Sequence, residues 1–323
     1  WGSPIIAVPP QKYRSFLMEA DKPWMAIDTT PSSPHRDAIY IVTNFNYFTS
    51  TSPLYSLIGI AHSDDHGKTW TTVHVGGVDR SPVIDYTTDL AIAADGTVYL
   101  SWFRCHKFSL SSGCSGPVDI LLVKSSDGGS TWSKPVLVHR VRFTPVPCSP
   151  FGCLPNTKEG VLNIPVIASD NSAGPYAGSL YECDNTFTAG HLSVQVTRSA
   201  DGGATWSAPV PVAGPGVRND EFFQWCSVSK DGTLGVTWLD RRNDPANVTY
   251  EAFGAYSKDG GATFSTNYQL AARPSNPKHD GFGGTFMGDY TGNTWAGEKL
   301  YAAWQDTSNG HTSRAIVGGL RIP

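Results

Sequence analysis

The sequence has few charged residues, no excess of basic residues and no long apolar run. Each of these absences argues against a class of fold or of binding partner. Charged side chains account for only 16% of the 323 residues, whereas glycine (33 residues), proline (23) and aromatic residues (11%) are abundant. This composition suits many short strands joined by tight turns better than long amphipathic helices. We therefore expect an all-β fold in which residues 1–323 form a single domain.

The charge balance and the hydropathy argue against two classes of partner. A net charge of −4 and an isoelectric point near 6.1 provide no basic field to attract phosphates, so nucleic acid is not an expected partner. No apolar run approaches the roughly 18 residues that a membrane-spanning helix needs. Membrane insertion is therefore not expected, and the oligomeric state stays open.

The six cysteines are an even set, which favours disulfides. No Cys-x-x-Cys pair occurs and no histidine falls at ligand spacing, so a zinc site built on cysteine is disfavoured. Among the possible connectivities we expect the following three bonds: Cys105 with Cys114, Cys148 with Cys153, and Cys183 with Cys226. Disulfides and the sequon Asn247-Val248-Thr249 favour a secreted or otherwise extracytoplasmic protein.

One octapeptide, Ser-x-Asp-x-Gly-x-Thr-Trp/Phe, occurs four times in the chain. The copies span residues 63–70, 125–132, 199–206 and 257–264. The aspartate can accept backbone N–H bonds and the glycine tolerates positive φ, so each copy is expected to form a hairpin turn. Recurrence at this interval is typical of propeller blades, in which each unit buries its faces against its neighbours.

Alternating runs around each octapeptide predict four strands per unit, which is the strand content of a propeller blade. The expected innermost strands number five and cover residues 24–28, 89–93, 164–169, 223–228 and 286–290. A five-bladed propeller follows, with six blades as the alternative. Residues 1–8 read as the end of a repeat, so the N-terminal and C-terminal strands are expected to close the ring together.

The four octapeptides resemble those of the Asp-box (BNR) repeat, sialidase-like superfamily, and segments 21–28, 238–244 and 288–292 are similar to sialidase-like proteins. The resemblance implies a propeller in which the boxes lie on the periphery and are structural. It also implies a site with three arginines that hold a carboxylate, a tyrosine nucleophile activated by a glutamate, and an aspartate acid/base. The Arg-Ile-Pro motif of the family lies near its N-terminus, whereas here Arg321-Ile322-Pro323 stands at the opposite end.

The inner strands and their flanking loops are expected to line a central funnel. A glycoside hydrolase that acts there on an acidic sugar would use Tyr290 helped by Glu221, with Asp85 or Asp89 as acid/base. The expected substrate-binding residues carry cationic, aromatic or acidic side chains: Arg104, Arg218, Arg241, Arg242, Trp24 and Asp280.

Two other functions fit the same funnel. A polysaccharide lyase would remove a proton from a uronate-containing glycan with His279 or Tyr290, beside Arg104 or Arg241. A non-catalytic propeller would instead bind carbohydrate or protein through aromatic side chains such as Trp24. No cofactor or metal ligand is assigned; calcium is compatible with the many carboxylates, but no segment has EF-hand spacing.

Overall fold

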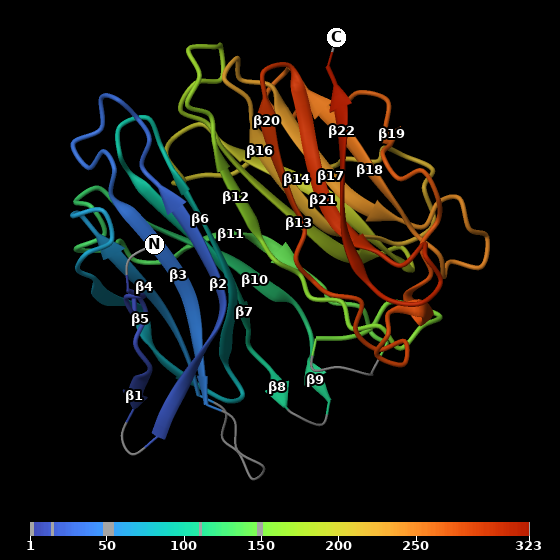
Figure 1. Ribbon diagram of the computed structural model, residues 1–323, viewed down its shortest axis with the longest axis horizontal. Coiled ribbons are helices and arrows are strands. Elements are labelled where there is room, and N and C mark those ends of the chain that lie inside the picture. Colours follow the sequence, from blue (N-terminus) through green and yellow to red (C-terminus); the bar gives the residue numbers. More distant parts are fainter. Residues whose placement is uncertain (1–2, 14–15, 48–54, 110–111, 147–150, 323) are drawn as a thin grey trace.

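The protein is almost entirely β-structure (Figure 1). The computed structural model describes residues 3–13, 16–47, 55–109, 112–146 and 151–322. These residues form 22 strands and one short 3₁₀ helix, η1 (Pro277–His279). No helix among them is long and apolar enough to cross a membrane. The predicted all-β class is therefore confirmed.

Five antiparallel sheets contain nearly all of the strands. Sheet 1 consists of β1 (Gln11–Tyr13), β2 (Phe16–Ile27), β3 (Ile39–Tyr47), β4 (Tyr55–Ser63) and β5 (Thr71–Arg80). Sheet 2 consists of β6 (Ile84–Ile92), β7 (Val98–Cys105), β10 (Val118–Ser125) and β11 (Val136–Val141). A separate small hairpin pairs β8 (Phe108–Ser109) with β9 (Gly113–Cys114).

The remaining three sheets follow the same order of strands. Sheet 3 consists of β12 (Val166–Ser169), β13 (Leu180–Thr188), β14 (His191–Ser199) and β15 (Val210–Pro211). Sheet 4 consists of β16 (Glu221–Val228), β17 (Leu234–Asp240), β18 (Glu251–Ser257) and β19 (Tyr268–Gln269). Sheet 5 consists of β20 (Gly292–Ala296), β21 (Lys299–Asp306) and β22 (Arg314–Arg321).

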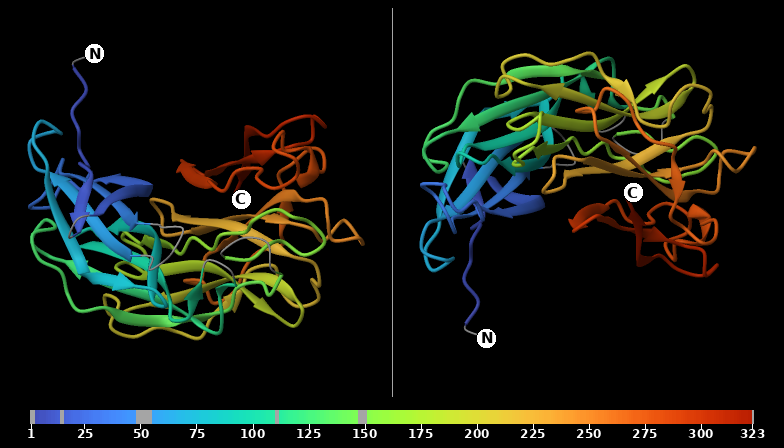
Figure 2. Two further views of the ribbon diagram at one scale, coloured as in Figure 1. Left: turned by 90° about the horizontal axis from the view of Figure 1, so that it is seen from below. Right: turned by 90° about the horizontal axis from the view of Figure 1, so that it is seen from above.

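The sheets are arranged radially around their first long strands. Strand β2 contacts β6, β6 contacts β12, β12 contacts β16, and β16 contacts β20, so these inner strands follow one another around an arc (Figure 2). Apolar clusters fill the spaces between successive sheets: one joins Tyr40 and Val42 of sheet 1 to Leu100 and Trp102 of sheet 2. Burial of these inter-sheet faces is the main force that stacks the units.

The octapeptide turns join the two outer strands of sheets 1 to 4, as the sequence predicts. In the second copy, the Ser125 hydroxyl accepts from Gly129 N at 2.9 Å and Asp127 Oδ1 accepts from Thr131 N at 2.9 Å. Gly129 has a φ of +89°, which a side chain would disfavour. The other three copies repeat these two hydrogen bonds, so the motif is a structural turn.

Two predicted strands differ from the structure. Residues 286–290 are not a strand, and the inner strand of sheet 5 begins only at Gly292. The reason is local: the buried Asp280 carboxylate accepts hydrogen bonds from the backbone N–H of residues 282, 284, 285 and 286 and folds them into a loop. Residues 3–10 lie outside any strand and extend away from the body (Figure 2), while β1 pairs with β2, so ring closure is not confirmed.

One of the three predicted disulfides is present among the described residues. Cys105 is bonded to Cys114, which ties the end of β7 to the β8–β9 hairpin. The predicted Cys183–Cys226 bond is wrong, because both residues are buried free thiols and the Cys226 thiol donates to the Val166 carbonyl at 3.7 Å. The predicted partner of Cys153 is Cys148, which lies outside the described residues.

Candidate functional site

A cavity of about 290 Å³ lies where the inner strands of sheets 1 and 2 meet the segments that lead into sheets 3 and 5. Its polar wall contains Asp21 and Lys22 from β2, Tyr86 from β6 and Asp289 from the segment before β20. Residues 160–162, which precede β12, and Phe286 complete much of the apolar wall. Side chains from four sheets or their leading segments therefore converge on one hollow.

Backbone irregularities in the inner strands direct these side chains. Strand β2 has a register shift between Asp21 and Trp24, β6 has one between Tyr86 and Thr88, and β16 has a third at the corresponding place. The non-glycine residues inside the shifts have positive φ: Lys22 (54°), Thr87 (47°) and Phe223 (49°). Such β-bulges re-aim side chains and concentrate next to active sites, and strained backbone is retained there.

Two carboxylates of the cavity are each held by a donor. The Tyr86 hydroxyl donates to Asp21 Oδ2, and Lys22 forms an ion pair with Asp289 Oδ2. Burial, followed by the hydrogen bond to Asp21, raises the pKa of Tyr86 well above its usual range, so this hydroxyl stays a donor. The other oxygen of Asp289, Oδ1, has no hydrogen-bond partner among the described residues.

An aromatic platform flanks the carboxylates. The rings of Trp24 and Tyr290 are stacked, with centroids 5.9 Å apart and planes 8° from parallel, and Trp225 packs against Trp24 at 4.5 Å. The Lys22 ammonium lies 4.3 Å from the centre of the Tyr290 ring. Tyr290 is 45% exposed, so one edge of this platform faces solvent. Burial, then the charges of Asp289 and Asp21, raises the pKa of Tyr290 to about 12.

Glu159 is a buried carboxyl that directly precedes the lining residue Gly160 in the sequence. Its Oε1 accepts from Met287 N at 2.7 Å, and its Oε2 is buried without a partner among the described residues. Burial is the main cause that raises the pKa of Glu159 to about 7, with Asp280 and Asp289 adding repulsion. Sequence reasoning missed Glu159, because the run 158–160 carries no motif that separates it from an ordinary loop.

The carboxylates predicted as catalytic partners of Tyr290 lie elsewhere. Asp89 Oδ2 accepts from Ile167 N of sheet 3 and Glu221 Oε2 accepts from Val194 N of sheet 3, both at 2.9 Å, so each bridges two sheets. Asp85 is held by Arg104 through two hydrogen bonds of 2.7 Å. Burial raises the pKa of Asp85 and Asp89 to about 7 and that of Glu221 to about 8.

The predicted arginines do not converge. Arg104 of sheet 2 pairs with Asp85 of the same sheet and with Asp79 of β5 in sheet 1. The fully buried Arg241 pairs with Asp220 at 3.3 Å. Arg242 binds Asp240 with a 2.9 Å hydrogen bond from Nε, and Arg218 is exposed. Each of the three paired arginines thus neutralises a carboxylate close to it in the fold, as structural ion pairs do.

The remaining two predicted residues lie in the loop before sheet 5. His279 is the exposed last residue of η1. Asp280 is fully buried; although burial opposes its ionisation, the backbone N–H groups that it accepts from hold its pKa below the usual range. Asp280 therefore shapes the loop that carries Phe286 and Asp289 to the cavity. Of the predicted site residues, the structure brings Trp24 into contact with Tyr290 and Asp85 into contact with Arg104.

The cavity offers two carboxylates and an ammonium that is paired with one of them, and the stacked rings of Trp24 and Tyr290 are next to these residues in the chain. Together these groups can bind and orient a polar, ring-shaped molecule. Among the described residues, one set of three His, Cys, Asp and Glu side chains has ligand atoms close enough together for a metal ion, and it lies away from this cavity: His139, Glu182 and Asp184.

Comparisons with known proteins find a distant sequence relative. No family model matches the chain. A xyloglucanase of Paenibacillus sp. is 27% identical over 236 residues, which is 67% of this chain and 19% of that protein. The chain thus spans about a fifth of the length of this curated relative, and the identity lies below the level that shows a family.

Solved structures share the fold at low sequence identity. An α-L-arabinofuranosidase of Fusarium graminearum in complex with arabinobiose has a TM-score of 0.55 and 12% identity, with 97% of this chain and 79% of that chain covered. A Hadza microbial sialidase has a TM-score of 0.52 and 15% identity, with 94% and 53% covered. These likenesses support a propeller-like, all-β architecture similar to that of sialidases, and they show the fold alone.

Proposed function

We propose that this protein is a glycoside hydrolase that acts at the cavity between Asp21 and Asp289. The observation that carries the proposal is the meeting of two donor-held carboxylates with the Trp24–Tyr290 platform. Glycosidases use a pair of carboxyl groups on either side of the scissile bond, and aromatic faces pack against sugar rings. The names of the xyloglucanase, arabinofuranosidase and sialidase relatives agree with a glycan substrate.

The roles follow from the contacts. Asp289, paired with Lys22, is assigned the role of nucleophile or base, and its buried Oδ1 has no hydrogen-bond partner among the described residues. Asp21 takes part as the second carboxyl, and the Tyr86 hydroxyl orients it. Tyr290 as nucleophile with Glu221 as its activator is less well supported, because Glu221 is bonded to Val194 N. Tyr290 is instead assigned to substrate binding.

We propose a neutral glycan as the substrate. Lys22 is the cation that lines the cavity, and Asp289 already balances its charge. The acidic sugar expected from the family resemblance needs a free arginine cluster, whereas Arg104, Arg241 and Arg242 are engaged with carboxylates. The same engagement disfavours a lyase, since a uronate carboxylate needs a cation to neutralise it. An extracytoplasmic location, supported by the Cys105–Cys114 disulfide, fits a polymeric glycan.

The test is a glycan panel with site variants. Release of reducing sugar from xyloglucan or arabinan oligosaccharides supports the proposal, and Asp21→Asn and Asp289→Asn should each lower kcat by about 100-fold or more. The matched control is Glu298→Gln, an exposed carboxylate paired with Arg321, which should keep full activity. Sialic acid release would favour the acidic-sugar alternative, and absorbance of an unsaturated uronate would favour the lyase. Tight glycan binding without turnover would make the protein a binding propeller.

We infer that sheets 1 to 5 are blades of one propeller domain. The succession of their inner strands and the likeness to sialidase folds support this inference. We propose that the ring is closed in one of two ways. Either residues 3–8 pair with the edge strand β22, or a sixth blade completes the ring. Amide hydrogen exchange tests it: protection of the β22 edge amides supports closure, and rapid exchange along that edge contradicts it.

A further inference from the structure

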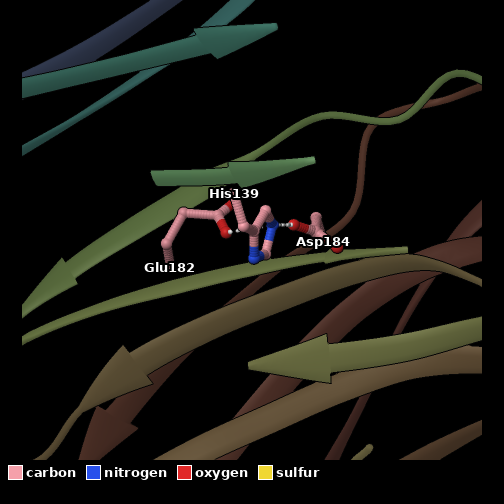
Figure 3. A group of neighbouring side chains, drawn as sticks. All are labelled: His139, Glu182 and Asp184. Atoms are coloured by element: carbon pink, nitrogen blue, oxygen red, sulfur yellow. Dashed lines mark hydrogen bonds and ion pairs between the residues drawn. The ribbon is translucent and has the colours of Figure 1, made fainter. Parts of the chain in front are cut away.

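Three titratable side chains meet between sheets 2 and 3, away from the proposed active site (Figure 3). His139 comes from β11, the outermost strand of sheet 2, and Glu182 and Asp184 come from β13 of sheet 3. Residues 182 and 184 are two positions apart in a strand, so their side chains share one face. Both carboxylates are 0% exposed and the imidazole is 9% exposed.

The contacts within this cluster leave it incomplete. His139 Nε2 lies 3.3 Å from Glu182 Oε2 and is hydrogen-bonded to Asp184 Oδ2. Gln195 donates to Asp184 Oδ1 at 2.9 Å, which turns Oδ2 toward the imidazole. Glu182 Oε1 and His139 Nδ1 are buried and have no hydrogen-bond partner among the described residues. Figure 3 shows the Glu182 carboxyl group directed toward the ring.

The charge of the cluster is also unbalanced. Neither carboxylate has a lysine or arginine partner within the part of the chain that the structure describes. Two buried carboxylates beside one imidazole are costly unless protons or a cation neutralise them. A divalent cation would neutralise both carboxylates. It would also give Glu182 Oε1, which has no hydrogen-bond partner among the described residues, a charge to bind.

We propose that His139, Glu182 and Asp184 bind a divalent transition-metal ion, for which zinc is the best match, and that this ion joins sheet 2 to sheet 3. The three ligand atoms lie within 4.8 Å of one another. Ligand atoms that bind zinc at about 2.0–2.2 Å are separated by roughly 3.4 Å in a tetrahedral site, close to the observed His139–Glu182 distance. The ion takes the position of the proton in the His139 Nε2–Asp184 hydrogen bond, and the imidazole binds as the neutral ring with its proton on Nδ1. The displaced proton, and any proton carried by Glu182, leave to solvent.

The ligand set discriminates between ions. Calcium takes six to eight oxygen ligands and magnesium a near-octahedral shell rich in water, whereas this buried site offers one nitrogen and two carboxylates. Imidazole with carboxylate suits zinc and its first-row neighbours. The Gln195 amide is the positioning group, because it holds Asp184 in the orientation that a ligand needs. Sequence reasoning had no signal for this site, since His139 is more than 40 residues from its partners.

The test uses tag-free protein, stripped with chelator and dialysed against Zn²⁺, Ca²⁺ or Mg²⁺. The expected result is one zinc per chain by elemental analysis, a Tm increase with Zn²⁺, and no such increase with Ca²⁺ or Mg²⁺. Glu182→Gln and Asp184→Asn should each weaken zinc binding at least about tenfold by calorimetry. The control His106→Gln removes an exposed imidazole paired with Asp119 and should leave zinc binding unchanged.

Folding of the variants is checked separately from binding. Glu182→Gln removes a buried carboxyl and keeps its shape, so without metal its Tm should equal or exceed that of the wild type. The Zn²⁺-dependent Tm increase should be lost in the same variant. Absence of stoichiometric zinc in the wild type, or equal zinc affinity in wild type and Glu182→Gln, overturns the proposal. Neither outcome depends on glycan hydrolysis, so this test is independent of the proposed function.

Discussion

Lys22 and Asp289 form an ion pair that joins the inner strand of the first sheet to the segment leading into the last, although 267 positions separate them in the sequence. The pair is partly buried, with side chains 11% and 15% exposed. The Trp24–Tyr290 stack lies beside it and makes the same connection. The two ends of the arc of sheets are thus fastened at the cavity proposed as the active site.

Breaking this ion pair should destabilise the protein. Lys22→Met leaves Asp289 without its counter-ion in a partly desolvated site, and we expect a loss of about 1–3 kcal/mol in the free energy of unfolding. The double variant Lys22→Met/Asp289→Asn should recover part of the loss, because it removes the unpaired charge. Urea denaturation of the four members of the double-mutant cycle measures this. Equal losses in the single and double variants would contradict the interpretation.

The aromatic platform should contribute to glycan affinity through the exposed part of its rings. Tyr290→Phe keeps the ring, so KM should stay within about threefold of the wild-type value, whereas Tyr290→Ala and Trp24→Ala should raise it by about tenfold. Steady-state kinetics on the best oligosaccharide of the panel separate KM from kcat. If Tyr290→Phe lost most of kcat while KM held, the hydroxyl would be the nucleophile and the role of Tyr290 would have to be reassigned.

The buried ion pair of Arg241 and Asp220 should be essential for stability. Arg241→Met leaves the Asp220 charge uncompensated in a fully buried position, and the expected loss is about 3–5 kcal/mol. Arg36→Met serves as the control because Arg36 and Asp37 form an exposed pair at 3.8 Å; the expected change is about 0.5 kcal/mol or less. Thermal denaturation compares the two variants, and similar Tm values would refute the assignment.

The octapeptide turns should make the protein sensitive to acid. Hydrogen bonds from the threonine four residues on lower the pKa of Asp65, Asp127 and Asp201 to about 2. Because the folded pKa is below the unfolded value, this stabilisation is present above about pH 4 and is lost as the pH falls toward 2. The triple variant Asp65→Asn/Asp127→Asn/Asp201→Asn should flatten the fall of Tm between pH 4 and 2. An unchanged slope would contradict this linkage.

Glu159 should make the stability of the protein fall as the pH rises, which is the opposite of the effect expected from the octapeptide aspartates. Its pKa of about 7 exceeds the ordinary value of a glutamate, so the folded state binds the proton more tightly and stability falls as the pH rises from about 4.5 to 7. Glu159→Gln should therefore be more stable than the wild type at pH 8, on the order of 2 kcal/mol, with little difference near pH 4. Urea denaturation at the two pH values measures this, and a constant difference would count against a buried carboxyl.

Features that depend on local sequence were predicted well. The octapeptide turns close their own hydrogen bonds between residues four apart, and glycine permits their positive φ, so their structure follows from eight residues. Four of the five expected inner strands overlap strands of the structure for the same reason, since alternation of side chains is a local property. The fifth failed because one buried carboxylate, Asp280, reorganises the backbone that follows it.

The site was predicted only in part. Trp24 and Tyr290 were singled out and meet in the structure, whereas Asp89 and Glu221 were placed in the funnel and instead bond to backbone N–H groups of the neighbouring sheet. A carboxylate in an alternating strand has the same local pattern whether it faces a cavity or a neighbouring backbone. The sequence likewise contains no pattern that predicts the pairing of Arg241 with Asp220.

The sequence by itself determined the all-β class, the octapeptide turns and the four-stranded unit that three of the five sheets form, because each of these arises from interactions within a few residues. The tertiary structure alone decided that Asp21 and Asp289 share a cavity, that Cys183 and Cys226 are not joined by a disulfide, and that His139 lies against Glu182. Those outcomes depend on how far each sheet is rotated and shifted against the next. That relation is set by the packing of many apolar side chains at once, and no short segment encodes it.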